Sequence, residues 1–147
     1  MQSMISEPAY RRDSTDMDIG QPERATQNRV VALFRDELHY RYLGDWRDRD
    51  DNSSIKEHLL TPFLIRSGYT PAQINKAIGD LRTEADHHSR GLYGNNKEVY
   101  KLLRYGVPVK IEAGKVTETV HLIDWKEPQK NDFAVAEEVT LHGNRDR

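Results

Sequence analysis

The chain has 147 residues, and 31% of them are charged. Its formal net charge is -2, and it contains no cysteine. The balanced charge excludes a nucleic-acid module that works by overall charge, so only a local basic patch could bind DNA. The absence of cysteine excludes a disulfide scaffold and a thiolate metal site. Residues 1–20 contain no apolar segment of the signal-peptide kind, and no apolar run is long enough to span a membrane. We therefore expect a cytoplasmic protein without membrane partners.

The N-terminal third is predicted to hold an arm and one helix. Residues 1–22 are polar, mixed in charge and without periodicity, which predicts a disordered arm, with a single domain over residues 23–147. The first helix is expected from about Glu23 to Leu38. Its apolar stripe comprises Val30, Val31, Phe34 and Leu38. Residues 39–52 are predicted to form a loop or a short extended piece.

The second helix has clear end signals. Ser54 and Glu57 have the S-x-x-E spacing of a capping box, and Gly68 is a typical C-terminal stop. One apolar face is formed by Ile55, Leu59, Leu60, Phe63 and Leu64. We expect a helix that begins at this capping box and packs on a core.

Two further helices follow. Thr70 is the expected cap of the third helix, with Gln73 at the capping-box position three residues later. After a glycine-containing loop, Asn95 or Asn96 can cap a fourth helix, which Gly106 ends. Its predicted buried positions are Val99, Leu102 and Leu103.

Three runs of strand-forming residues close the chain, at 107–112, 116–125 and 133–141. Apolar residues alternate along the first and third runs, which places one face of each on a core. The short turn at 113–114 predicts a hairpin from the first two runs. We therefore predict an α+β fold, with helices packed on an antiparallel three-stranded meander. This sheet looks incomplete because only polar residues and glycine follow the third run.

Glu137 is the strongest single candidate for a functional residue, because it falls among the apolar positions of the third run. A carboxylate that faces a core costs free energy unless it is paired, protonated or bound to a cation. One interpretation is a metal- or proton-handling group at the rim of the sheet. The other is a bulge at 137–138, or an uncovered stretch of sheet, that leaves Glu137 in water.

An acidic cluster precedes the second helix and comprises Asp45, Asp48, Asp50 and Asp51. Counted from Asp48, it lacks the glycine and the final glutamate of an EF-hand loop. A solvated loop before a helix N-terminus is the plainer interpretation. The adjacent pair His87 and His88 points two rings in different directions on a helix, which is poor metal geometry.

Basic residues recur along one side of the fourth helix. Lys97, Lys101 and Arg104 follow i, i+4, i+7 spacing, and Lys110 and Lys115 follow on the hairpin. An ordinary solvated helix face is the plainer interpretation, and a stripe that contacts DNA phosphates is the functional one. No glycine-rich phosphate loop and no serine–histidine–acid pattern is present, so the residues alone predict no nucleotide site and no reaction.

Four segments carry a resemblance to a known family. They are TQNRVVALFRDELHYRYLGDW (26–46), NKEVYKLLRYGVPVK (96–110), TVHLIDW (119–125) and NDFAVAEEVTLHGN (131–144). In order and over nearly the whole chain, they resemble the N-terminal region of the restriction (R) subunit of type I restriction–modification enzymes.

The resemblance implies a nuclease domain of the PD-(D/E)xK kind, incomplete here, in which Mg²⁺ activates water for phosphodiester cleavage. It also implies ATP-dependent motor domains elsewhere in the full enzyme, and a complex with double-stranded DNA and with methyltransferase (M) and specificity (S) subunits. For this chain alone we expect no cofactor.

The chain departs from the family pattern at the catalytic motif. The family's proline–aspartate pair would follow the segment that resembles residues 142–147, and its E-x-K would come on the next strand. Neither is present, and Asp146 follows arginine instead of proline. Of the catalytic residues, only Glu57 is carried over, because it resembles the helix carboxylate that assists metal binding.

These observations leave two hypotheses of different kinds. In the first, the chain is the N-terminal part of an R subunit, takes part in ATP- and Mg²⁺-dependent DNA cleavage in the full complex, and is inactive alone. In the second, it is a non-catalytic module that binds DNA or docks to the other subunits, or the remnant of a truncated gene.

Overall fold

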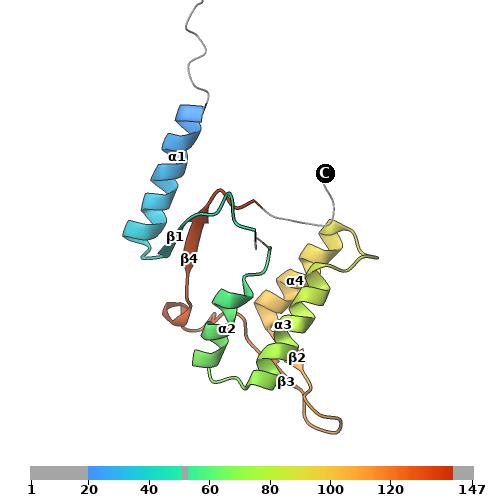
Figure 1. Ribbon diagram of the computed structural model, residues 1–147. Helices are drawn as coiled ribbons and strands as arrows, with labels where there is room; N and C mark the ends of the chain where they lie inside the picture. The colour runs from blue at the N-terminus through green and yellow to red at the C-terminus, as the bar shows by residue number, and fades with distance from the viewer. Residues whose placement is uncertain (1–19, 51–52, 141–147) are drawn as a thin grey trace, which may run out of the picture. The chain divides into compact units, whose positions relative to one another are not determined.

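A computed structural model describes residues 20–50 and 53–140 (Figure 1). They fall into two compact units, of which one ends at His39 and the other begins at Tyr40.

The first unit is helical. Helix α1 spans Gly20–Ala32 and continues into a π-helical turn, η1, at Leu33–Glu37, which is closed by a hydrogen bond from the Leu38 N–H to the Leu33 carbonyl at 3.0 Å. The predicted first helix is thus confirmed, but it begins before Glu23. The rest of the predicted disordered arm, residues 1–19, lies outside the described residues.

The second unit mixes helices and short strands. In chain order its elements are β1 (Arg41–Asp45), α2 (Glu57–Arg66), α3 (Pro71–Ala85), α4 (Leu92–Tyr105), β2 (Val107–Val109), β3 (Glu118–Val120), the 3₁₀ turn η2 (Pro128–Lys130) and β4 (Ala134–Glu137). The α+β class is therefore confirmed, and the short extended piece expected within residues 39–52 is β1.

The core lies between the helices and the β2–β3 hairpin. The two strands pair antiparallel, with Val107 opposite Val120, as the turn at 113–114 predicts. The buried apolar side chains are Phe63, Leu64, Ile74, Ala77, Ile78, Leu81, Val107, Val109, Val120 and Leu122. Val99, Leu102 and Leu103 of α4 pack against this cluster and are only partly buried, so α4 covers its edge.

The predicted three-stranded meander is wrong. Strand β4 does not join the hairpin but pairs in parallel with β1, with Arg41 opposite Ala134 and Tyr42 opposite Val135. The loop before β4 is closed locally, because the Asn131 amide accepts from the Asp124 N–H at 2.8 Å and donates to the Asp124 carbonyl at 2.9 Å. A parallel pair needs a long crossover, and α2, α3, α4 and the hairpin supply it. The described residues therefore form two two-stranded sheets, which do not display the sheet of a PD-(D/E)xK nuclease.

The start of α2 differs from the prediction. Its N-cap residue is Lys56, without a side-chain hydrogen bond, so the capping box of Ser54 and Glu57 does not form. The Ser53 hydroxyl instead hydrogen-bonds the Ile55 carbonyl at 2.6 Å, which closes a turn before the helix. Glu57 is the first helical residue of α2, and its carboxylate is paired with Arg82 of α3.

The ends of α3 and α4 follow local signals more closely. Thr70 and Gln73 form the predicted capping box of α3, with the Gln73 side chain accepting from the Thr70 N–H at 2.8 Å. Helix α4 begins at Leu92, one turn before the predicted cap, so Asn95 lies inside it. It ends at Gly106, whose φ of 87° suits glycine; a Cβ there would lie 2.5 Å from the Thr119 methyl group.

Candidate nucleic-acid interface

Helix α4 presents one exposed face that mixes cations and aromatic rings, which we call the α4 stripe. It comprises Tyr93, Lys97, Tyr100, Lys101, Arg104 and Tyr105, all exposed. At about 100° per residue these six positions fall within an arc of about 140°, so they form one continuous surface. The opposite side of α4 carries the residues that pack on the core.

The cations of the stripe are only partly neutralised. Lys101 pairs with Glu98 at 2.7 Å, and this hydrogen bond is the main cause that lowers the pKa of the Glu98 carboxyl. Within the described residues, Lys97 and Arg104 form no ion pair with a carboxylate. The predicted basic stripe is therefore a real surface feature with two cations available to an external anion.

Lys110, the fourth predicted DNA contact, lies elsewhere. It follows β2 in the hairpin and is exposed. The fold thus brings Lys97, Lys101 and Arg104 together on one helix and leaves Lys110 on a separate element.

A large pocket opens at the C-terminal ends of α2 and α4, and we call it the α2–α4 pocket. It has a volume of about 820 Å³. It is lined by Phe63, Arg66, Ser67 and Tyr69 of the α2 end, Arg104 and Tyr105 of α4, and His121, Ile123, Asp124, Trp125, Lys126 and Lys130. Three separate segments of the chain therefore meet there, and two members of the α4 stripe form part of its wall.

Trp125 is fixed in the wall of this pocket. Its indole N–H donates to the Leu103 carbonyl at 2.9 Å, and the Arg104 guanidinium lies 5.1 Å from the ring centroid. The ring remains 50% exposed, and the neighbouring Tyr105 is 71% exposed. Two aromatic surfaces are thus held open at the mouth of the pocket.

Asp124 is the lone carboxylate among the residues that line the pocket. It accepts hydrogen bonds from the backbone N–H groups of Glu127 at 2.9 Å and Lys126 at 3.0 Å. The bond from Glu127 is the main cause that lowers the pKa of Asp124, with the bond from Lys126 acting in the same sense. The carboxylate thus stays charged and serves to shape its own loop.

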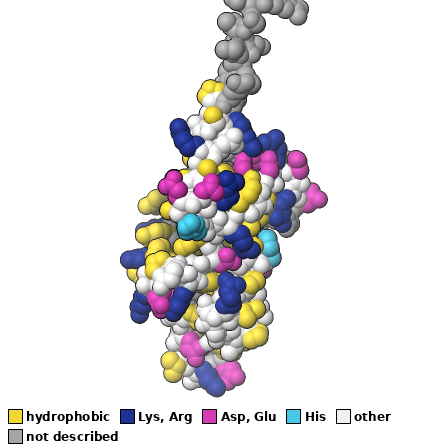
Figure 2. All heavy atoms as spheres, turned by 90° about the vertical axis from the view of Figure 1, so that its left-hand side faces the viewer, with side chains coloured by type: hydrophobic (Ala, Val, Ile, Leu, Met, Phe, Trp, Pro, Cys, Tyr) yellow, Lys and Arg dark blue, Asp and Glu magenta, His cyan; other side chains and the backbone are white. Residues whose placement is uncertain are grey.

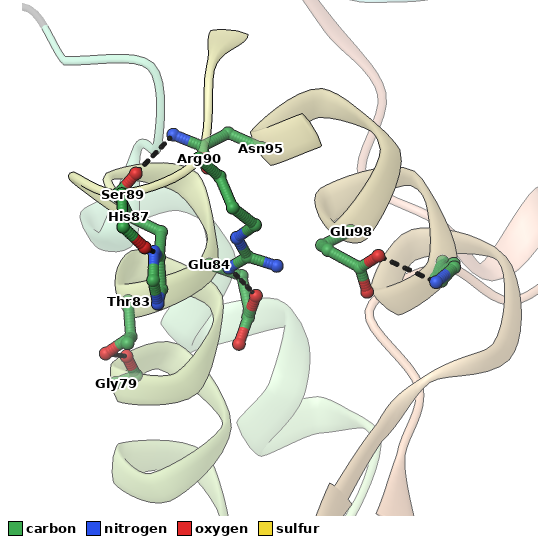
Figure 3. Close-up of polar contacts among 9 residues, drawn as sticks. Gly79, Thr83, Glu84, His87, Ser89, Arg90, Asn95 and Glu98 are labelled. Carbon is green, nitrogen blue, oxygen red and sulfur yellow. Dashed lines mark hydrogen bonds and ion pairs between the residues drawn. The ribbon is translucent and has the colours of Figure 1, made fainter. Parts of the chain in front are cut away.

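A polar cluster between α3 and α4 is structural in its contacts (Figure 3). Arg90 extends to Glu84 and forms an ion pair with it, while the Asn95 side chain donates to the His87 carbonyl at 3.3 Å. These bonds tie the loop after α3 to both helices.

Glu57, the predicted assisting carboxylate, lies at the start of α2 and faces α3. Its Oε1 accepts from the Arg82 guanidinium, through Nε at 3.0 Å and through a second nitrogen. It is 41% exposed at the side chain. The residue is accessible, but its charge is paired, and its predicted catalytic role stays a prediction.

Glu137 is buried, with 6% of its surface exposed, as its place in the apolar alternation indicates. Its Oε1 accepts from the Tyr42 hydroxyl of the neighbouring strand at 2.5 Å. A bulge does occur, but on β1, where Leu43 and Gly44 lie opposite the single residue Ala136. The interpretation in which Glu137 lies in water is therefore wrong, while its metal-binding role stays a prediction.

The described carboxylates do not by themselves make up a metal site. Among residues 20–50 and 53–140, no group of three or more His, Asp or Glu side chains could hold a metal ion. Asp51 of the predicted acidic cluster lies outside the described residues, and Asp45 bonds its own loop through the Arg47 N–H at 2.9 Å. No catalytic step through a metal can be derived from these residues.

A comparison with known families shows which family the chain belongs to. Residues 20–147 match the family model described as type I restriction enzyme R protein N terminus, HSDR_N. The chain belongs to this family. No curated protein and no solved structure was found to match it. The resemblance of the four sequence segments to the N-terminal region of the type I R subunit is thereby confirmed.

The HSDR_N chain carries both signs of charge on its surface. Lys and Arg side chains lie interspersed with Asp and Glu on the face that Figure 2 shows. No helix in the described part of the chain has the length and apolar character that a bilayer crossing requires.

Sequence reasoning missed the aromatic part of this HSDR_N surface. Tyr93, Tyr100 and Tyr105 lie at the same helical angles as the predicted cations, a signal that was open to periodicity. Trp125 and the pocket could not be found that way, because the α2 end, the α4 end and residues 121–130 meet only in the fold.

Proposed function

We propose that this chain serves the R subunit in endonucleolytic cleavage of unmodified DNA, and that its described residues contribute DNA contacts. The observation that carries the proposal is the α4 stripe, which interleaves three cations with three tyrosines on one exposed face. Lysine and arginine bind phosphates by displacing counterions, and exposed aromatic rings add contact area. Membership of the HSDR_N family supports the assignment to a restriction enzyme.

The same proposal assigns the chemistry of cleavage to ligands beyond the described residues. The described carboxylates do not form a metal-binding set among themselves, so a role of Glu57 or Glu137 in cleavage requires ligands outside residues 20–50 and 53–140. Dependence on Mg²⁺ and ATP, and assembly with M and S subunits, belong to the full enzyme in this proposal. The support for these cofactors and partners is family membership. The described residues contain no glycine-rich loop that could bind the phosphates of a nucleotide.

A salt titration tests the DNA contact. The double variant Lys97→Glu/Arg104→Glu removes the two cations of the stripe that lack an ion pair. Each lost phosphate contact lowers the slope of log affinity against log salt by about 0.9, so we expect the slope for duplex DNA to fall by roughly 1.8. Affinity should fall most at low salt.

The matched control is Arg29→Glu/Lys76→Glu, which changes the net charge equally at exposed positions on α1 and α3. We expect this control to keep nearly the wild-type slope. If the slope fell equally in the two double variants, the effect would come from net charge alone. The α4 stripe would then not be the DNA contact. Binding that does not depend on salt would have the same consequence.

A further inference from the structure

We propose that the α2–α4 pocket binds one unstacked nucleotide of a single-stranded DNA segment, with its base against Trp125 and Tyr105 and its phosphates beside Arg66, Lys126 and Lys130. This inference rests on the proposed DNA contact of the α4 stripe and adds to it an adjoining site that shares Arg104 and Tyr105 with the stripe. The pocket volume of about 820 Å³ lies in the range of roughly 300–1,000 Å³ that small-molecule sites occupy.

The aromatic wall suits a base that has left its stack. Every base offers a π-face, and aromatic side chains bind it without regard to sequence. Trp125 is already held by the Leu103 carbonyl and by Arg104, so little freedom is lost when a base stacks on its open face. In a duplex the base faces are covered by neighbouring bases, so the site selects a single strand.

The charge of the lining favours a polyanion. Arg66, Arg104, Lys126 and Lys130 line the pocket, against Asp124. Asp124 is already engaged by two backbone N–H groups of its loop. Within the described residues, Lys126 forms no ion pair with a carboxylate, while Arg66 lies 3.8 Å from Asp132.

Lys130 also keeps its charge. The hydrogen bond to Glu127, at 2.5 Å, raises its pKa above the usual range, so it is protonated at neutral pH. An incoming phosphate would share this cation with Glu127.

The position of the pocket connects it to the stripe. Arg104 and Tyr105 belong to both surfaces, so a strand that follows α4 toward its C-terminal end arrives at the pocket. A free nucleoside triphosphate is a poorer fit, because the lining offers separate cations and no glycine-rich loop to enclose three phosphates. The occupant we assign is therefore part of a strand.

The experiment compares a single-stranded oligothymidylate with a duplex of the same length, bound to the full chain at fixed salt. Tyr105→Ala removes an exposed ring from the pocket and should not disturb the core. Alanine substitution of a stacking ring should lower single-strand affinity by roughly 5-fold to 100-fold, with a much smaller change for the duplex. Lys126→Gln should lower single-strand affinity in the same direction.

The control is Tyr93→Ala, which removes an exposed ring from the same helix but not from the pocket. It should leave the ratio of single-strand to duplex affinity at the wild-type value. A ratio that stays the same in Tyr105→Ala and Lys126→Gln as well would overturn the inference, even if the α4 stripe still binds duplex DNA.

Tryptophan fluorescence gives a second readout that separates the two proposals. The chain has two tryptophans, Trp46, which is buried, and Trp125. The oligothymidylate should quench the fluorescence of the wild type, and Trp125→Phe should lose this signal. If the oligothymidylate quenches the wild type but duplex DNA does not bind, the DNA contact of the stripe is refuted and the single-strand site in the pocket still stands. Stronger quenching by ATP than by the oligothymidylate would overturn the strand as occupant.

Discussion

The helix–hairpin core and the β1–β4 sheet are stabilised in different ways. The core buries ten apolar side chains from α2, α3 and the hairpin region, with Leu64 and Val120 fully buried. In the β1–β4 sheet and the residue after β1, the buried side chains are Glu137 and Trp46. Burial of apolar surface is the main driving term of folding, so we expect the core to hold most of the stability.

The small sheet depends instead on polar and aromatic contacts. Tyr42 donates to Glu137, and the Trp46 ring lies beneath the cations of Arg49 at 4.2 Å and Lys56 at 5.0 Å. A two-stranded sheet is marginal without further cover. We therefore expect the region that carries the α4 stripe to be the more stable part of the described fold, and the β1–β4 sheet to be the less stable part.

The largest effect is expected in the core. Leu64→Ala should lower the free energy of unfolding by about 2–5 kcal/mol, because it removes a fully buried side chain and leaves a cavity. Urea unfolding measures this change. Ile65→Ala, one position along the same helix, is the control, since its side chain is 59% exposed. Similar losses in the two variants would show that α2 does not bury the face described here.

The next effect concerns the junction between α4 and the hairpin. Gly106→Ala should cost about 1–3 kcal/mol from backbone strain alone, and the new Cβ would also meet the Thr119 methyl group. Gly79→Ala in α3 is a control of opposite sign, because its Cβ meets nothing within 4 Å and alanine favours a helix by about 0.5–1 kcal/mol. Equal melting shifts in the two variants would refute the described end of α4.

A smaller effect is expected in the β1–β4 sheet. Tyr42→Phe removes the hydroxyl that donates to Glu137 and should cost about 1–2 kcal/mol. Tyr100→Phe, on the exposed face of α4, should leave stability unchanged. If Tyr42→Phe cost as much as Leu64→Ala, the two regions would be equally important for stability, and the contrast between them would fail.

The smallest effect depends on pH. Backbone N–H groups hold the pKa of Asp124 below its usual range, so its contribution is present above the unfolded pKa and is lost as pH falls through the folded pKa. Asp124→Ala should therefore be less stable than the wild type at pH 7, and the difference should shrink on acidification. A difference that grows toward low pH would contradict this sign.

Helix-capping signals predicted several helix ends correctly. Contacts between residues far apart in the chain could not be predicted from such signals. Thr70 with Gln73, and Gly106, act within a few residues of themselves, so their roles could be read correctly. Ser54 and Glu57 have the same capping spacing, but Arg82, far along the chain, takes the Glu57 carboxylate. The pairing of β4 with β1 is similarly distant, and alternation along a strand does not tell which partner it meets.

The candidate site divides in the same way. The cations of the α4 stripe follow from helical periodicity, whereas for Glu137 the alternation left two interpretations open, and the structure rules out the one in which it lies in water. The α2–α4 pocket brings together ends of helices and a loop, which no spacing in the sequence connects.

We propose that DNA contacts the α4 side of the helix–hairpin core and not the β1–β4 sheet. Amide chemical-shift mapping of the full chain, during titration with a short duplex, tests it most directly. We expect the shifts to concentrate in residues 93–105, with further shifts in 121–130 when a single strand is added. Shifts concentrated in residues 41–46 and 134–137 would contradict it.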